Sequence, residues 1–226
     1  GPAESVGVMP NDRIVEVDGV NVVGIKREDV PAKLRGERGS VVNIGVVRRG
    51  QAEMLRFSIT RDNIPINTVD AAFWADRDKK IAYVKVNRFG STTMTEFREA
   101  MARMEGAESL ILDLCGNGGG LLTQAVDMAG YFLPKGSLVV STEGRTVPED
   151  KFLSLGECEF DGRVVVLLNE ASASASEIVA GALQDWDRGV VVGRDSFGKG
   201  LVQRQIPLGD GSAVRITVAR YHTPSG

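Results

Sequence analysis

Short runs of alternating apolar and polar residues characterise the first part of the chain. Arg13–Val17 alternates and ends in the tight turn Asp18-Gly19, as a half-buried strand does. Two β-rich runs follow a short helical segment and are joined by the turn Arg49-Gly50. We therefore expect a small β-rich unit over residues 1–62. Its expected elements are strands at Arg13–Val17, Val41–Arg48 and Met54–Thr60 and a helix at Glu28–Leu34.

The pattern changes further along the chain, where apolar strands alternate with amphipathic helices. Phe97, Met101 and Met104 recur with helical spacing and predict the buried face of one helix. Strands that alternate with helices usually pair in parallel, so residues 63–226 predict an α/β (α+β) core. The expected strands are Ile81–Val86, Ser109–Leu114, Leu138–Thr142, Val164–Leu168 and Val190–Val192, and the expected helices are Thr93–Met104, Leu121–Phe132 and one that follows Ser174.

Three other segments have simpler expected roles. Asn63–Asp70 has the composition of a connector between the two units. The polar segment Glu143–Gly162 is expected to be an ordered loop over the functional site. The tail predicts a hairpin, with strands at Val202–Pro207 and Ala213–Arg220.

Composition narrows the range of functions. Apolar residues make up 42% and charged residues 25% of the 226 residues, which are globular values. The formal net charge of -3 provides no electrostatic case for a nucleic-acid partner. No apolar run is long enough to span a membrane. Cys115, Cys158 and the single histidine, His222, form neither a disulfide framework nor a zinc-site spacing, so no zinc site is expected.

The candidate chemistry lies between the strand ending at Leu168 and the hairpin. Ser172, Ser174 and Ser176 alternate with alanines at a predicted strand-to-helix turn, and Lys199 follows between two glycines. A hydroxyl at such a turn and a lysine in a tight loop are typical of an activated nucleophile and its base. A lysine accepts protons near pH 7 only when it is desolvated, so this hypothesis requires a shielded Lys199. Alternatively, the serines only cap the helix and the lysine lies on the surface.

A glycine-rich loop, Gly116-Asn117-Gly118-Gly119-Gly120, joins another predicted strand to its helix. This order of elements also builds phosphate sites, but the loop lacks the Gly-Lys-Ser/Thr ending of one. Glycines also let backbone N–H groups face a developing negative charge, as in an oxyanion hole. A plain tight turn is the third interpretation.

Longer stretches resemble two known families. Val8–Val20 and Asp29–Val42 resemble the middle and later part of a PDZ domain, whose first strands and carboxylate-binding loop would precede Gly1. Ser172–Asp185, Phe197-Gly198-Lys199-Gly200 and Val202-Gln203 resemble the catalytic core of the carboxy-terminal processing (tail-specific) serine proteases. Asp113–Leu122 resembles the second signature of that family. We expect the chain to be a piece of a longer protein, trimmed at both ends, with a partial PDZ domain before the core.

The resemblance implies a crotonase/ClpP-like core and a Ser–Lys dyad. On this basis Ser174 is the nucleophile, Lys199 is the general base and Gln203 orients the lysine. The N–H groups of Ala175 and Gly119 would form the oxyanion hole, with Gly118 and Gly120 as the neighbouring candidates. The implied reaction is acyl transfer from a peptide carbonyl to the serine, with no cofactor.

One position departs from the family pattern. Cys115 stands where the resemblance implies an arginine, two residues after Asp113. Arginine offers a rigid, charged fork of donors that cysteine cannot replace. Cys115 follows a buried strand and is expected to be an inert thiol. We expect the change to affect loop stability or rate more than the identity of the dyad.

Three functions fit these observations. The first is a serine endopeptidase that cuts proteins recognised through apolar C-terminal tails, and the second is a weak or inactive homologue that only binds such tails. The third is a crotonase-like acyl-CoA enzyme, which would not need Lys199. The resemblance implies protein or peptide partners and an extracytoplasmic setting, typically the bacterial periplasm or cell envelope. Any membrane association would come through segments outside this chain.

Overall fold

A computed structural model describes residues 1–26, 28–64 and 67–226. The chain divides into two compact units, Gly1–Ile66 and Asn67–Gly226, where the sequence predicts a boundary after residue 62. Residues 65–66 of the predicted connector lie outside the described residues.

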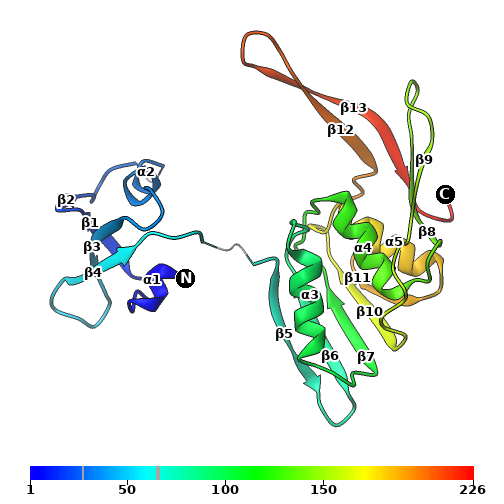
Figure 1. The fold of residues 1–226 in the computed structure, drawn as a ribbon, viewed down its shortest axis with the longest axis horizontal. Helices are drawn as coiled ribbons and strands as arrows, with labels where there is room; N and C mark the ends of the chain where they lie inside the picture. Colours follow the sequence, from blue (N-terminus) through cyan, green and yellow to red (C-terminus); the bar gives the residue numbers. More distant parts are fainter. Residues whose placement is uncertain (27, 65–66) are drawn as a thin grey trace. The chain divides into compact units, whose positions relative to one another are not determined.

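The first unit is built on a small antiparallel sheet (Figure 1). Its strand order is β2-β1-β3-β4, and each neighbouring pair is antiparallel. Val17, Val42, Ile44, Val46 and Ile59 point into one apolar core, as the alternation in the sequence predicts. The elements are α1 (Pro2–Ser5), β1 (Arg13–Val17), β2 (Val20–Asn21), α2 (Val30–Leu34), β3 (Val41–Val47) and β4 (Leu55–Thr60).

An ion pair ties the turn before β1 to the end of β3. The Arg48 guanidinium donates to both Asp12 carboxylate oxygens at 2.8 Å, and the Met9 N–H donates at 2.9 Å. Hydrogen bonds from Arg48, and then from Met9, lower the pKa of Asp12 from 3.8 to about 2. Because the folded-state pKa is depressed, this stabilisation is complete above the ordinary pKa and is lost as the pH falls toward 2.

We expect the Asp12→Asn variant to lack this part of the acid dependence. The thermal unfolding of the first unit can be followed by NMR through the Met9 and Arg48 amides. Between pH 4 and pH 2 its midpoint temperature should fall less in the variant than in the parent. Identical shifts in the two proteins would contradict the assigned role of Asp12.

The second unit contains a five-stranded sheet in the order β11-β10-β7-β6-β5 (Figure 1). The pairs β6–β7, β7–β10 and β10–β11 are parallel, which confirms the predicted parallel core, whereas β5 runs antiparallel to β6. Part of β5 lies in the predicted connector, and the rest was not predicted. The strands are β5 (Val69–Asp76), β6 (Ile81–Val86), β7 (Ser109–Asp113), β10 (Arg163–Leu168) and β11 (Gly189–Gly193).

Three helices pack on this sheet (Figure 1): α3 (Thr93–Ala102), α4 (Leu122–Phe132) and α5 (Ala175–Asp185). Alternate residues of β6, β7 and β10 are buried and most of those between them are half-buried, so one face of the sheet carries most of the core. Phe97, Met101 and Met104 are buried, as their helical spacing predicts. These helices leave the carboxyl ends of β7 and β10 free to carry loops.

A second, antiparallel sheet corrects the expectation for Leu138–Thr142. This strand does not continue the parallel core; it pairs antiparallel with β9 and β13, in the order β12-β13-β8-β9. An apolar run alone does not reveal its pairing direction, which depends on residues about 80 positions away. The strands are β8 (Leu138–Glu143), β9 (Asp150–Leu153), β12 (Leu201–Pro207) and β13 (Ala213–His222).

The segment Glu143–Gly162 also differs from its expected role as a loop over the site. It contains β9, and its later part packs against the end of α4. Phe160 stacks edge-to-face on Phe132, and the Ser154 hydroxyl donates to the Leu133 carbonyl. Phe152 and Phe160 of this segment therefore pack against the core, whereas Leu153 and Leu155 remain exposed.

Candidate active site

Ser174 lies at the sharp turn between β10 and α5. It is the N-cap residue of α5 and has φ 57 and ψ −111, a conformation that few non-glycine residues adopt. A strained strand-to-helix turn of this kind presents a side chain outward above the carboxyl end of a sheet. The backbone therefore gives Ser174 the position that a nucleophile needs.

The two flanking serines have structural roles. The Ser172 hydroxyl donates to the Leu114 carbonyl at 2.8 Å, and the Ser176 hydroxyl donates to the Asn117 carbonyl at 2.9 Å. Both residues are fully buried, whereas Ser174 is half-buried. Of the three alternating serines, Ser174 is thus the one whose side chain remains available for chemistry.

The glycine loop lies directly against the nucleophile turn. A Cβ atom added to Gly119 would be 2.7 Å from the Ala173 oxygen, 2.8 Å from Ser174 Cβ and 3.0 Å from the Ala175 nitrogen. The φ of 96° at Gly119 also disfavours any side chain. The N–H of Gly119 donates to Asn117 Oδ1 at 2.9 Å, so it must leave this partner to bind an oxyanion. The assignment of Gly119 and Ala175 as the oxyanion hole stays a prediction.

Glu177 joins the turn that carries Ser174 (the nucleophile turn) to the loop that carries Lys199 (the lysine loop, residues 196–200). Its Oε2 accepts the N–H of Ser174 at 2.6 Å and that of Lys199 at 3.0 Å. Its Oε1 accepts the N–H of Gly198 at 2.6 Å and the hydroxyl of Ser196 at 2.7 Å. One carboxylate therefore fixes the backbone on both sides of the predicted dyad.

Ser174 and Lys199 face the same pocket. It has a volume of about 240 Å³ and combines polar groups with an apolar wall formed by Val140, Ile178 and Tyr221. Its remaining lining residues are Ser174, Glu177, Gly198, Lys199, Gly200 and Thr223. Residues of α5, of the lysine loop and of the second sheet thus form the pocket together.

Gln203 is not brought to this pocket. It is exposed on β12 and opposite Thr217 of β13, and it is absent from the pocket lining. Its proposed orienting role toward Lys199 stays a prediction. His222 also lies outside the lining, at the end of β13.

The described residues show neither a metal-binding cluster nor a membrane-spanning helix. Among residues 1–26, 28–64 and 67–226, no group of three or more His, Cys, Asp or Glu side chains is arranged to hold a metal ion. Within these ranges no helix is both long and apolar enough to cross a membrane.

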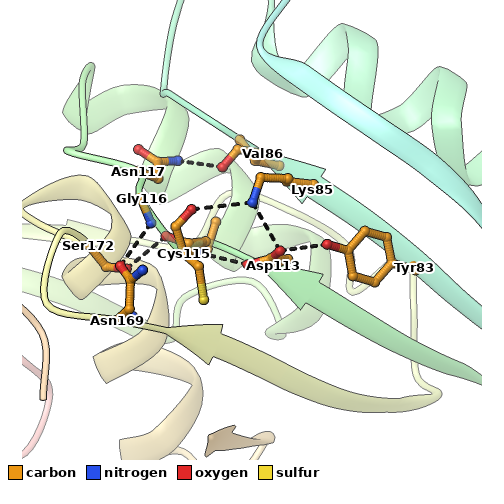
Figure 2. Close-up of polar contacts among 10 residues, drawn as sticks. Tyr83, Lys85, Val86, Asp113, Cys115, Gly116, Asn117, Asn169 and Ser172 are labelled. Carbon is orange, nitrogen blue, oxygen red and sulfur yellow. Dashed lines mark hydrogen bonds and ion pairs between the residues drawn. The ribbon is translucent and has the colours of Figure 1, made fainter. Parts of the chain in front are cut away.

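Cys115 immediately precedes the glycine loop (Figure 2). Burial, together with hydrogen bonding and charge from Asp113, raises the pKa of the thiol to about 11. A thiol with so high a pKa is a poor nucleophile near neutral pH, consistent with the inert role expected from the sequence.

Two residues of the site were missed by sequence reasoning. Glu177 follows Ser174 by three positions, which is the spacing of a helix capping box, and that signal could have identified it. Asn117 offers no comparable local signal. The Asn117 side-chain amide donates to the Val86 carbonyl, and the backbone carbonyl of Asn117 accepts the N–H of Ala173. Both contacts depend on distant segments of the chain.

Replacement of Glu177 by glutamine is expected to lower kcat for peptide cleavage by about 10²-fold. In the variant an NH₂ donor replaces one of the two carboxylate oxygens and faces backbone N–H groups that need an acceptor. The lysine loop therefore loses its fixed position. Steady-state kinetics on a peptide substrate would measure the effect. Glu170→Gln is a matched control, because Glu170 lies in the connection between β10 and α5 and its side chain forms an exposed ion pair with Arg194. An unchanged kcat in Glu177→Gln would contradict this role.

Family models identify the class to which this fold and site belong. Residues 80–226 match the model of peptidase family S41, and residues 1–48 match that of a PDZ domain. The chain belongs to peptidase family S41. This confirms the resemblance to carboxy-terminal processing proteases and to a PDZ domain, and the expected α/β core that follows a β-rich unit in the sequence.

Individual relatives have consistent names. A carboxyl-terminal-processing protease of Synechocystis sp. is 37% identical over 226 residues, covering 99% of this chain and 53% of the relative. Carboxy-terminal processing protease CtpA of Bacillus subtilis is 36% identical over 227 residues, covering 100% of this chain and 48% of the relative. The solved structure of a photosystem II D1 C-terminal processing protease has a TM-score of 0.63 at 35% identity, covering 100% of this chain and 62% of that chain. The chain spans about half the length of the curated relatives it matches.

Proposed function

We propose that this chain carries the catalytic site of a serine endopeptidase, with Ser174 as nucleophile and Lys199 as general base. The observation that carries the proposal is the shared pocket, which both residues line while Glu177 fixes the backbone of each. Membership of peptidase family S41 supports the same reaction class.

The proposed reaction is acyl transfer. The Ser174 hydroxyl oxygen attacks a peptide carbonyl carbon while the Lys199 amine accepts the hydroxyl proton. The protonated lysine then donates to the leaving amine, and water hydrolyses the acyl-enzyme with the lysine again as base. The N-terminus of α5, including the Ala175 N–H, favours the negative charge that develops on the carbonyl oxygen. Gly119 is proposed to supply the second donor.

The proposed substrates are proteins and peptides with apolar C-terminal tails. The apolar pocket wall of Val140, Ile178 and Tyr221 suits an uncharged side chain next to the scissile bond. The names of the relatives refer to carboxyl-terminal processing, and residues 1–48 match the PDZ model, a domain class that binds extended tails by strand addition.

The cellular setting is proposed to be extracytoplasmic, in the bacterial periplasm or cell envelope, on the resemblance alone. Fractionation of cells that express the full-length protein would test it, and recovery in the cytoplasm would overturn it.

Cleavage of a loosely folded protein with an apolar tail tests the proposed function. The full-length protein should cut this substrate, and should cut it faster than a copy whose tail ends in aspartates, with fragments identified by mass spectrometry. Tail binding without cleavage would favour a homologue that has lost the chemistry. Hydrolysis of an acyl-CoA thioester without peptide cleavage would favour the acyl-CoA enzyme instead.

A further inference from the structure

A lysine on β6 lies at the start of the glycine loop (Figure 2). Lys85 pairs in register with Asp113 at the end of β7. Its Nζ is 3.2 Å from Asp113 Oδ2 and 3.5 Å from the Cys115 carbonyl oxygen. Only 29% of the Lys85 side chain and 9% of the Asp113 side chain is exposed. Lys85 therefore contacts both the strand end and the first turn of the loop.

The Asp113 carboxylate is the centre of this cluster. Its Oδ1 accepts the Cys115 N–H at 2.8 Å, and its Oδ2 accepts the Tyr83 hydroxyl at 2.5 Å as well as the Lys85 ammonium. A buried carboxylate is stable in its charged form only with such partners. Within the described residues, Lys85 is the cation paired with Asp113.

The loop that begins here holds the nucleophile turn. The Leu114 carbonyl accepts the Ser172 hydroxyl, and the Asn117 carbonyl accepts both the Ala173 N–H and the Ser176 hydroxyl. The Gly116 N–H also donates to Asn169 Oδ1 at 2.9 Å. A shift of the loop at Cys115 would thus move the residues on both sides of Ser174.

We propose that Lys85 is a positioning residue that fixes the first turn of the glycine loop and, through it, the alignment of the Gly119 and Ala175 N–H groups with Ser174. The loop carries no cation of its own at Cys115, so the adjacent strand supplies one. This inference rests on the proposed function, because it concerns the alignment of the same site.

The opposite end of the same strand pair provides a matched control. Lys80, just before β6, forms an ion pair with Glu108, just before β7, and both side chains are largely exposed. This pair contacts neither the glycine loop nor the nucleophile turn. It therefore separates a general effect on β6–β7 pairing from an effect on the loop.

Kinetics of Lys85→Met, Lys85→Arg and Lys80→Met test the proposal. We expect Lys85→Met to lower kcat for peptide cleavage by about 10- to 100-fold with KM within about twofold, because alignment and not substrate contact is lost. Lys85→Arg should keep most of the kcat, and Lys80→Met should equal the parent. Adding Cys115→Arg to Lys85→Met should recover part of the loss, because residue 115 already contacts the Asp113 carboxylate through its backbone N–H and an arginine there would return a cation to this position.

Hydrogen exchange provides a readout that does not depend on catalysis. The amides of Cys115, Gly116 and Gly119 should exchange faster in Lys85→Met than in Lys80→Met. Unchanged kcat and exchange in Lys85→Met, or equal losses in Lys80→Met, would overturn the proposal. If the parent cleaves no peptide, the proposed function fails, and the exchange rates alone decide whether Lys85 positions the loop.

Discussion

Replacement of Ser174 by alanine is expected to lower kcat for peptide cleavage by about 10⁶-fold, to the background of the assay. The turn leaves Ser174 as the available hydroxyl in the pocket that Lys199 also lines, while Ser172 and Ser176 are buried and donate to the carbonyls of Leu114 and Asn117. Without the nucleophile, no acyl-enzyme can form. Cleavage of the apolar-tailed protein, followed by mass spectrometry, would measure the loss.

The neighbouring serines provide the controls for this prediction. Ser172→Ala and Ser176→Ala each leave a loop carbonyl without one donor, so we expect each to lower the free energy of unfolding by about 1 kcal/mol. Both should still form an acyl-enzyme. Full cleavage by Ser174→Ala, or its complete loss in Ser176→Ala despite an intact fold, would place the nucleophile elsewhere.

Replacement of Lys199 by arginine is expected to abolish cleavage almost as completely as Ser174→Ala. Arginine keeps the positive charge and a long side chain, but its guanidinium stays protonated and cannot accept the serine proton. A general base alone accelerates a reaction by about 10²–10⁴-fold. When the base and the nucleophile act as a unit, removal of either one can cost nearly the whole rate enhancement that the unit supplies. Steady-state kinetics on one peptide substrate would compare the single variants with the Ser174→Ala/Lys199→Arg double variant.

The double variant should be no slower than either single variant, because both changes remove the same step. Lys135→Arg serves as a control at an exposed lysine paired only with Glu157. Retained activity in Lys199→Arg would mean that the lysine acts only through its charge, and would remove the dyad from the mechanism.

Local pattern explains which elements of the fold could be predicted from sequence. β6, β7 and β10 combine dense apolar residues with flanking turns, and α3 has a clear helical period, so each was found close to its true bounds. The sequence does not predict β5 as a strand, because its alternation is weakened by alanines and no residue of the strand is fully buried. The antiparallel pairing of β8 depends on β13, far along the chain, and no local signal encodes it.

In the candidate site too, the residues with a local sequence signal could be predicted, and those that depend on distant contacts could not. Ser174 and Lys199 stand in runs of small and glycine residues that are specific enough to be recognised, and the structure places both at one pocket. The capping-box spacing to Ser174 is a local signal for Glu177, but its contact with Lys199, like that of Lys85 with Asp113, joins segments that are distant in sequence and emerges only from the folded chain. Gln203 was assigned by resemblance, and its exposed position on β12 leaves that assignment a prediction.

The mode of attachment of the lysine loop has a consequence for protein engineering. Glu177 holds this loop through the backbone N–H groups of Gly198 and Lys199, and not through the lysine side chain. The loop should therefore keep its place whatever side chain stands at position 199. A cysteine introduced there and alkylated to an aminoethyl thioether would restore an amine of nearly the same length. Position 199 is thus suited to the installation of synthetic bases of graded strength beside an unchanged serine.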